Sequence, residues 1–201
     1  MAARVLDFYF DFISPFGYLA SLRVDDLAAK YGYDCRWHSM LLGISVLKVM
    51  GMKPLPSYPL KGPYLEHDLW RAARRQGVAL NRPEKQANPI PAGRCFHWLK
   101  GRDESLARSF AKAALHAYWH DGTDIGLPQT VGTLAAAVGA DRDDVLFQIT
   151  EGRGDQALRS AVERALERGV FGSPFFIIEG EPFFGLEKME LVEEWLSTGG
   201  W

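Results

Sequence analysis

Apolar residues near the start of the chain follow first a strand pattern and then a helix pattern. Residues 4–12 form a short, aromatic and partly alternating run, which is typical of a β-strand. Between Ser14 and Gly32 the apolar residues recur at helical spacing, and residues 33–40 again have strand character. A strand, a helix and a strand in so few residues predict a parallel pair of strands with a right-handed crossover.

The middle of the chain has a different pattern. Residues 51–59 contain three prolines, which lack amide donors, so this stretch is predicted to be a surface loop rather than a regular helix. From there to residue 168 the apolar spacing is almost entirely helical, interrupted by Gly, Asp and Pro. The predicted helices are residues 64–76, 105–120, 129–138, 142–150 and 155–167.

The last segment returns to strand character. Residues 170–185 contain two apolar runs on either side of a Glu-Gly pair, which predicts a β-hairpin. Residues 187–197 follow as an amphipathic helix. The fold class is therefore α/β, with a large all-helical insertion between a βαβ half and a ββα half.

Composition excludes several classes of function. The 201 residues carry a net charge of −2 and a pI near 6.2, which gives no general attraction for nucleic acid. No segment is long and apolar enough for a membrane span or a signal peptide, so we expect a cytoplasmic protein without membrane contact. Cys35 and Cys95 lie far apart, so they indicate neither a disulfide framework nor a zinc site.

Residues 14–17, with the sequence Ser-Pro-Phe-Gly, lie between the first strand and the first helix. Ser14 suits the N-cap of that helix and Pro15 its first turn, where a missing N–H is not needed. The free amides and the dipole at such a helix end favour a bound anion, the dipole by roughly 0.3–1 kcal/mol. The alternative is that Ser14 is only a helix cap.

A second motif is the pair Ser173 and Pro174, which comes just before a strongly apolar strand. Proline does not fit a central strand without a special arrangement, and the position is compatible with a cis peptide bond. A cis bond there would leave the backbone of Ser173 free to pair with an extended ligand.

Three spaced motifs carry a family resemblance. Residues 11–20 (Asp-Phe-Ile-Ser-Pro-Phe-Gly-Tyr-Leu-Ala) resemble the opening signature of 2-hydroxychromene-2-carboxylate isomerases and kappa-class glutathione transferases, in the DsbA-like branch of the thioredoxin superfamily. Residues 169–176 are similar to that family's cis-proline strand, and residues 183–185 to its aromatic–glycine step. The resemblance implies a thioredoxin-like domain of residues 1–60 and 169–201 with an inserted helical subdomain of residues 61–168.

The chemistry implied by the resemblance depends on an external thiol. Redox relatives carry Cys-x-x-Cys where this chain has Ser14 and Gly17, so disulfide exchange is not available to this site. The resemblance implies glutathione as the cofactor, with Ser14 donating a hydrogen bond to its thiolate. Reversible addition of that thiolate would isomerise 2-hydroxychromene-2-carboxylate or a similar aromatic hydroxy-carboxylate.

The resemblance also implies binding residues. Ser14, Ser173 and Pro174 would contact the cysteinyl unit of glutathione. The γ-glutamyl end would meet a run of four residues: Phe184, Gly185, Leu186 and Glu187. Relatives usually have Asn or Gln followed by Asp where this chain has Leu186 and Glu187, and a leucine side chain cannot form a hydrogen bond.

Lys48, Lys61 and Asn88 match positions that face the substrate in the family, where a carboxylate needs a cation. The alternative is that the two lysines are solvated side chains and Asn88 is a turn residue. Asp7 and Asp11 flank the first strand and could assist a base, although carboxylates near a strand end more often accept hydrogen bonds from backbone amides.

Other functions stay open or are disfavoured. A kappa-like transferase that conjugates glutathione to electrophiles and a ligand-binding relative without turnover are both compatible with these residues. His116 and His120 lie one helical turn apart, but no third metal ligand suggests itself, so no metal is predicted. Ser14 lacks the Gly-x-Ser-x-Gly elbow of a hydrolase. Relatives are commonly homodimers, and the same is expected here.

Overall fold

A four-stranded mixed sheet forms the centre of the computed structural model, which describes residues 4–81 and 85–201. Residues 1–3 and 82–84, at the N-terminus and inside the predicted insertion, lie outside the described residues. The order of the strands across the sheet is β2 (Asp34–Ser39), β1 (Val5–Phe10), β3 (Phe175–Ile178) and β4 (Glu181–Phe184). β1 and β2 are parallel, whereas β3 is antiparallel to both β1 and β4. The predicted parallel pair and the predicted hairpin are therefore confirmed.

Alternation along β1 gives the sheet two different faces. Phe8 and Phe10 point into the larger core, together with residues of α1 (Pro15–Ser21), α2 (Val24–Lys30) and α9 (Met189–Thr198). Tyr9 points to the opposite face, where it joins a smaller core with Ala165 of α8 (Gly154–Glu167). The sheet thus separates the helix that begins at Ser14 from the helix that covers Tyr9.

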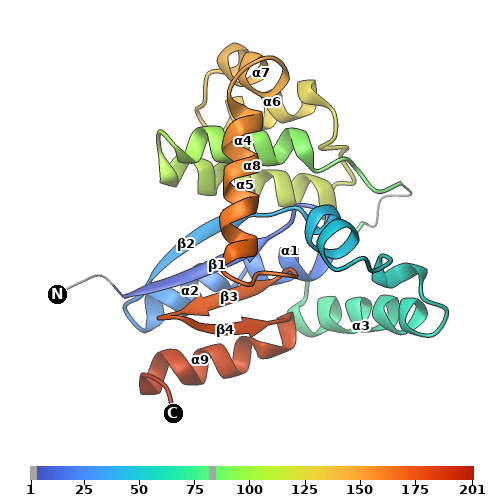
Figure 1. Cartoon of the computed structure of the whole chain (residues 1–201), viewed down its shortest axis with the longest axis vertical. Helices are drawn as coiled ribbons and strands as arrows, with labels where there is room; N and C mark the ends of the chain where they lie inside the picture. Colours follow the sequence, from blue (N-terminus) through green and yellow to red (C-terminus); the bar gives the residue numbers. More distant parts are fainter. Residues whose placement is uncertain (1–3, 82–84) are drawn as a thin grey trace.

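Helices fill the chain between β2 and β3. α3 (Lys61–Gln76) contacts α1, and Figure 1 shows it beside the sheet. The others form a layer above the sheet in Figure 1, from which α8 extends down across β1 and β2. They are α4 (Ile90–Lys100), α5 (Glu104–Trp119), α6 (Pro128–Ala137), α7 (Arg142–Thr150) and α8. The α/β fold with an all-helical insertion is thus confirmed.

The core is continuous between the sheet and the helical layer. The ring of Phe10 lies 5.5 Å from that of Phe96 on α4, and the ring of Phe12 lies 6.2 Å from that of Phe110 on α5. All four side chains are fully or almost fully buried. Because these rings touch across the boundary, the sheet and the helices are stabilised by one shared set of contacts.

The structure corrects the single helix expected between Ser14 and Gly32. It is two helices, α1 and α2, and the backbone leaves helical geometry at Arg23, which has φ −126°. Leu22, which fitted the helical spacing, is 43% exposed at the break, while Val24 and Leu27 are buried. The break lets each half turn its apolar side chains toward the core.

Two further elements, α4 and the π-helical segment after β2, were not predicted from the spacing of apolar residues. α4 was not among the predicted helices, because prolines at 89 and 91 obscure its start, although proline is tolerated in a first helical turn. The loop after β2 begins with a π-helical segment, η1 (Gly43–Val49), before the prolines. The proline-rich stretch itself holds only the short 3₁₀ turn η2 (Leu55–Ser57), in agreement with its prediction as a loop.

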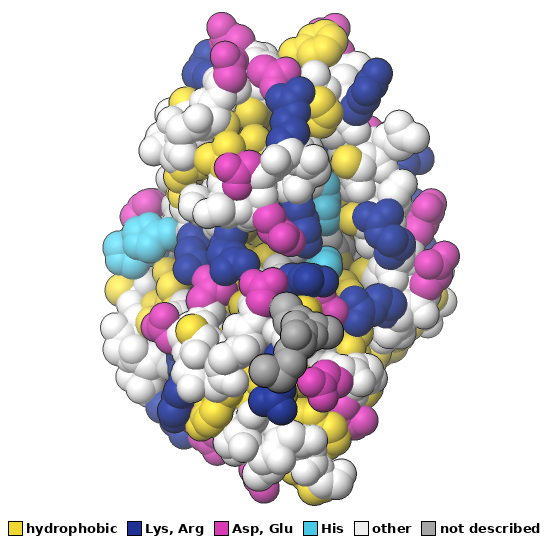
Figure 2. All heavy atoms as spheres, turned by 90° about the vertical axis from the view of Figure 1, so that its left-hand side faces the viewer, with side chains coloured by type: hydrophobic (Ala, Val, Ile, Leu, Met, Phe, Trp, Pro, Cys, Tyr) yellow, Lys and Arg dark blue, Asp and Glu magenta, His cyan; other side chains and the backbone are white. Residues whose placement is uncertain are grey.

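The face of the molecule that includes β2 has basic and acidic side chains interspersed over its surface (Figure 2). Among residues 4–81 and 85–201, no helix combines the length and the apolar character needed to cross a membrane.

Candidate functional site at the start of α1

Ser14 begins α1 as its N-cap, as the sequence predicts. Its backbone is extended, with φ −94° and ψ 113°, and its Oγ accepts a hydrogen bond of 3.0 Å from the Gly17 N–H. Pro15 occupies the first turn. The side chain of Ser14 is only 4% exposed, so the hydroxyl lies in a largely dry environment at the positive end of the helix.

The same hydroxyl connects the two motifs found in the sequence. Ser14 Oγ donates a hydrogen bond of 3.0 Å to the backbone carbonyl of Ser173, whose peptide bond to Pro174 is cis. The Ser173 hydroxyl in turn accepts a 3.0 Å hydrogen bond from the Asp11 N–H. Residues that are 159 positions apart in the chain therefore share one hydrogen-bonded cluster.

The start of α1 and the Ser173 loop lie so close together that position 17 has room only for glycine. A Cβ atom built on Gly17 would lie 2.6 Å from the Oγ of Ser173, closer than real Cβ atoms approach their neighbours. A side chain at position 17 would thus force α1 away from the loop that contains Ser173.

Two backbone amides of this cluster have no acceptor within the described part of the chain. They are the N–H of Phe16, in the first turn of α1, and the N–H of Ser173. The first turn of a helix always leaves such donors, which side chains, water or an anionic ligand can satisfy. Both amides therefore remain available to a ligand, one on the first turn of α1 and one on the cis-proline loop, which the Ser14–Ser173 hydrogen bond joins.

Asp11 is a fully buried carboxyl group that fixes the loop before Ser14. It accepts hydrogen bonds from the N–H of Ile13 at 3.1 Å and from the N–H of Leu42, at the start of η1, at 2.7 Å. Burial raises the pKa of Asp11 to about 7, although the two N–H donors act in the opposite direction. Of the two roles considered for this residue, the structure shows the acceptor of backbone amides.

Trp119 of α5 is a further anchor that sequence reasoning did not identify. Its indole N–H donates a hydrogen bond of 2.9 Å to the carbonyl oxygen of Phe12, two residues before Ser14. No motif marks this contact, because it joins positions 107 residues apart. The helical insertion therefore holds the loop that positions Ser14.

The residues from Phe184 to Glu187 form the corner after β4. Gly185 has φ 108°, which favours glycine, and its N–H donates a 3.0 Å hydrogen bond to the carbonyl of Pro174. The 3₁₀ turn η3 (Leu186–Lys188) follows and contacts α1. Leu186 packs against the main core, whereas the Glu187 side chain is exposed.

Phe184 is 42% exposed and packs on Phe171, with 4.7 Å between the ring centres. The structure thus brings six of the predicted cofactor residues into one neighbourhood with Ser14: Ser173, Pro174, Phe184, Gly185, Leu186 and Glu187.

The three predicted substrate residues lie apart from this cluster. Lys48 is exposed on η1, and Lys61 is exposed at the start of α3 with its ammonium 5.8 Å from the ring centre of Tyr58. Asn88 is exposed, and its Oδ1 accepts a 3.1 Å hydrogen bond from the Ile90 N–H, as a turn asparagine does. Within the described residues no hydrogen bond or ion pair joins them to Ser14 or Ser173.

The two cysteines do not supply a reactive thiol. Cys35 and Cys95 are both buried and free, and burial raises the pKa of each thiol. A thiol that stays protonated inside the core is a poor nucleophile.

His116 and His120 have a third candidate metal ligand that the sequence analysis did not find. The carboxylate of Asp121 lies 2.8 Å from His120 Nδ1 and 3.4 Å from His116 Nδ1. All three side chains are exposed, and the hydrogen bond from His120 lowers the pKa of Asp121. The Asp121 carboxylate thus contacts both imidazole rings at the surface, and the expectation that no metal binds here stays a prediction.

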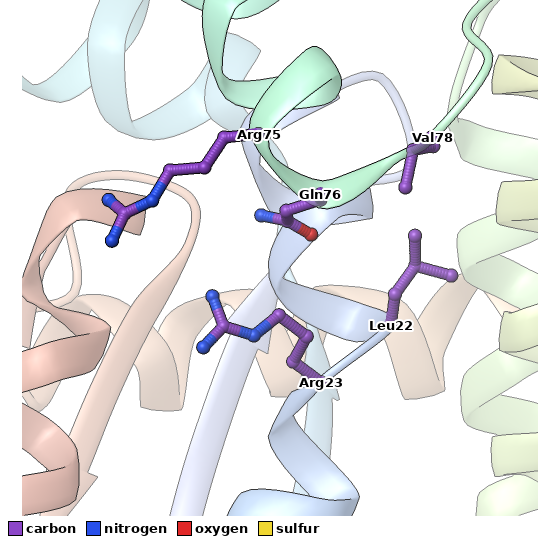
Figure 3. A pocket seen from close by; sticks show the side chains of 5 residues that line it. All are labelled: Leu22, Arg23, Arg75, Gln76 and Val78. Atoms are coloured by element: carbon purple, nitrogen blue, oxygen red, sulfur yellow. The ribbon is translucent and has the colours of Figure 1, made fainter.

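A hollow of about 410 Å³ lies at the other end of α1. Leu22 and Arg23 approach it from the break between α1 and α2, and Arg75, Gln76 and Val78 approach it from the end of α3 (Figure 3). The seven residues of α1, which span about 10 Å at 1.5 Å per residue, separate this hollow from Ser14. It is therefore not part of the Ser14 site.

Comparisons with known proteins agree with this architecture. The family model of the DSBA-like thioredoxin domain matches residues 5–197. The chain is 31% identical over 200 residues to a 2-hydroxychromene-2-carboxylate isomerase from Sphingobium xenophagum, covering 96% of this chain and 98% of that protein. It is 25% identical over 208 residues to glutathione S-transferase kappa 1 from Caenorhabditis elegans, covering 96% and 90%. A solved structure of a 2-hydroxychromene-2-carboxylate isomerase superposes with a TM-score of 0.83 at 26% identity, covering 94% and 93%.

Proposed function

The chain belongs to the DsbA-like thioredoxin family and, within it, to the 2-hydroxychromene-2-carboxylate isomerases, and we propose that it uses glutathione as cofactor and Ser14 to stabilise the cofactor's thiolate. The substrate would be 2-hydroxychromene-2-carboxylate or a similar aromatic hydroxy-carboxylate. The observation that carries this proposal is the buried Ser14 hydroxyl at the start of α1, within hydrogen-bond distance of the Ser173 backbone.

The need for an external thiol follows from the residues present. Positions 14 and 17 hold serine and glycine, and the two cysteines of the chain are buried with raised pKa values. Glutathione, when bound, supplies the thiolate that adds to the conjugated substrate and leaves again after rotation about the resulting single bond. The kappa-class relative carries glutathione in its name, which supports this choice of thiol.

The residues at the site fit such a cofactor. The Ser14 hydroxyl can turn from the Ser173 carbonyl to a thiolate, and the amides of Phe16 and Ser173 have no acceptor among the described residues. Together with the helix dipole these donors lower the pKa of a bound thiol. Because the pKa of Asp11 is about 7, its carboxyl is partly neutral near that pH, which limits repulsion of an anion beside it.

The γ-glutamyl end would meet Phe184, Gly185, Leu186 and Glu187. The exposed carboxylate of Glu187 can pair with the ammonium of the cofactor, while Leu186 offers only apolar contact. Lys48 and Lys61 would bind the carboxylate of the substrate and Asn88 its hydroxyl, which requires that their segments approach the Ser14 cluster when substrate is bound.

We expect Ser14→Ala to lower turnover of 2-hydroxychromene-2-carboxylate by roughly tenfold to a hundredfold, the cost of one hydrogen bond to a charged group. Calorimetric titration would measure the binding of glutathione. The ultraviolet absorbance of the bound thiolate, followed against pH, would show a higher thiol pKa in the variant. Asp103→Ala is the matched control, because Asp103 caps α5 in the same way, accepting from Leu106 N–H at 2.9 Å, away from this site. Equal turnover in wild type and Ser14→Ala would refute the role of Ser14.

A kappa-like transferase is the second candidate, favoured by the match to glutathione S-transferase kappa 1. The mass of the product separates the two reactions, because only a transferase adds glutathione to the substrate. Tight retention of ligand without turnover, unchanged by Ser14→Ala, would instead indicate a binding protein.

We propose further that the protein acts in the cytoplasm as a homodimer. Several apolar side chains along the segment from η1 to the first turn of α3 are exposed, among them Leu60 at 87%, Tyr64 and Val49. Exposed apolar surface of this extent is typical of a protein interface. Light scattering would give twice the 22.5 kDa of one chain if the proposal holds, and the mass of one chain would contradict it.

A further inference from the structure

A second hollow, of about 280 Å³, lies on the face of the sheet opposite α1. It is lined by Tyr9 of β1, His38 of β2, His97 and Lys100 of α4, and Arg164 and Arg168 from α8 and its C-terminal end. In the view of Figure 2, from the side of the molecule that includes β2, histidine and basic side chains lie near the centre. Its volume is near the lower limit of ligand pockets, roughly 300 Å³, which suits a small polar molecule. Tyr9 belongs to the smaller core beneath α8, so this hollow is separate from the Ser14 site.

His97, one of the residues that line this hollow, keeps one ring nitrogen free as a hydrogen-bond acceptor. It is buried, and its Nε2 lies 2.8 Å from the carbonyl oxygen of Ser39. A carbonyl only accepts, so Nε2 carries the proton and Nδ1 keeps its lone pair. Burial lowers the pKa of His97 to about 3, so the ring is neutral. Within residues 4–81 and 85–201 no donor reaches Nδ1.

Two cations at the hollow are held in place by neighbouring groups. Lys100 is 19% exposed, and its ammonium donates to the Trp37 carbonyl at 2.5 Å and lies 3.2 Å from Glu104. Arg168 donates to the Tyr9 hydroxyl at 2.6 Å and pairs with Asp7 at 2.9 Å. Their positions are therefore fixed before any ligand arrives.

Arg164 differs from these two, because none of the described residues forms an ion pair with its guanidinium. It lies one helical turn before Arg168 and faces the same hollow. The acidic groups nearby, Asp7 and Glu104, already contact other cations. Three cations thus face two carboxylates, which leaves an excess of positive charge and one guanidinium without a partner.

The geometry points to a binding site for a phosphate group, free or as a monoester, in this hollow. A tetrahedral oxyanion can accept hydrogen bonds from the guanidinium of Arg164, since guanidinium groups are usual ligands of phosphate. Lys100, whose ammonium already contacts the Trp37 carbonyl, Glu104 and Nδ1 of His38, would contribute positive charge. A protonated phosphate oxygen can donate to Nδ1 of His97. Hydrogen phosphate combines both kinds of group, whereas sulfate at neutral pH has only acceptors.

The first test is calorimetric titration of the whole protein with inorganic phosphate at neutral pH and low salt. We expect saturable binding of one phosphate by the wild type. Arg164→Gln should weaken it about tenfold or more, as expected for the loss of a hydrogen bond to a charged group. Arg153→Gln removes the same charge from the exposed N-cap of α8 and should change the affinity by less than about twofold. No saturable binding by the wild type, or equal losses in both variants, would overturn the proposal.

The second test needs no variant. Nuclear magnetic resonance of the imidazole groups should show the His97 signals shifting with phosphate in proportion to saturation, and less with sulfate. Phosphate binding that leaves the His97 signals unchanged would place the ion elsewhere and overturn the proposal. Phenyl phosphate distinguishes the two sources of the group when it is titrated at about pH 5.5, where the ester also keeps one protonated oxygen. Tighter binding of the ester then indicates a phosphorylated metabolite, and tighter binding of the ion indicates free phosphate.

Discussion

Asp11 links three segments of the chain through one buried side chain and its backbone. The carboxyl group holds the N–H groups of Ile13 and Leu42, and its backbone N–H donates to Ser173. The loop before α1, the start of η1 and the cis-proline loop are therefore connected at this residue. A carboxyl group in such a place titrates differently in the folded and unfolded chain, which makes stability depend on pH.

The direction of that dependence follows from the raised pKa. The pKa of Asp11 is about 7 in the folded protein and about 3.9 in an unfolded chain. Between these pH values the folded state binds more protons at this residue than the unfolded state does. The contribution of the protonated Asp11 carboxyl group to the free energy of unfolding is therefore fully present below about pH 4. It is lost as the pH rises through about 7.

We expect Asp11→Asn to remove this contribution. The difference in free energy of unfolding between wild type and variant should be largest near pH 4 and should shrink up to about pH 7, as measured by urea denaturation. Asp26→Asn, on an exposed position of α2, controls for the loss of one carboxylate. A difference between wild type and Asp11→Asn that stays constant from pH 4 to 8 would contradict the raised pKa.

At the scale of elements, the site depends on how closely the start of α1 approaches the cis-proline loop. Only the absence of a side chain at Gly17 lets the Ser173 hydroxyl lie where it does. The corner after β4 is attached to the same loop by the hydrogen bond from Gly185 to Pro174. The relative position of these three elements therefore determines the geometry around Ser14.

We expect Gly17→Ala to destabilise the protein by about 1–3 kcal/mol, as overpacking does, and to reduce isomerase turnover. Thermal unfolding and activity assays would measure both effects. Gly43→Ala is the matched control, because a Cβ at Gly43 would meet nothing within 4 Å. If both variants behave like wild type, α1 and the cis-proline loop are less closely packed than the structure indicates.

At the scale of the whole molecule, aromatic rings join the sheet to the helical layer. Phe96 of α4 lies 5.5 Å from Phe10 of β1 and 6.5 Å from Phe12, measured between ring centres. The boundaries predicted at residues 60–61 and 168–169 stay a prediction, but the core does not stop at them. Sheet and helices should therefore unfold together.

We expect Phe96→Ala to cost about 3–5 kcal/mol of stability and to destabilise both layers equally. Circular dichroism reports mainly the helices. Fluorescence of the buried Trp37 of β2, with the other tryptophans replaced by phenylalanine, reports the sheet. The two transitions should coincide in wild type and variant. Phe147→Ala, at a position that is 55% exposed, should change stability far less. Separate transitions would argue for two independent domains.

The sequence by itself determined the class of fold and the chemistry of residue 14. Alternating and helical spacing of apolar residues predicts β1, β2, the hairpin and most helices. An element that buries one face needs apolar residues at regular intervals within a short stretch of sequence, so the pattern can be read locally. Ser14 and Pro15 identify the start of α1, because capping depends on neighbouring residues alone. The break at Arg23 was not predicted, since packing of the two helices against the core decided it, and α4 was not predicted because the prolines at 89 and 91 obscure its start.

Only the tertiary structure decided what surrounds Ser14. The contacts of its hydroxyl with Ser173, of Trp119 with Phe12 and of Asp11 with Leu42 join residues that no local pattern connects. The same holds for the hollow at His97 and Arg164, which lie on two different helices of the insertion. Periodicity and capping are properties of a short window of sequence, whereas a site is formed by the relative position of elements, which the packing of the whole core fixes.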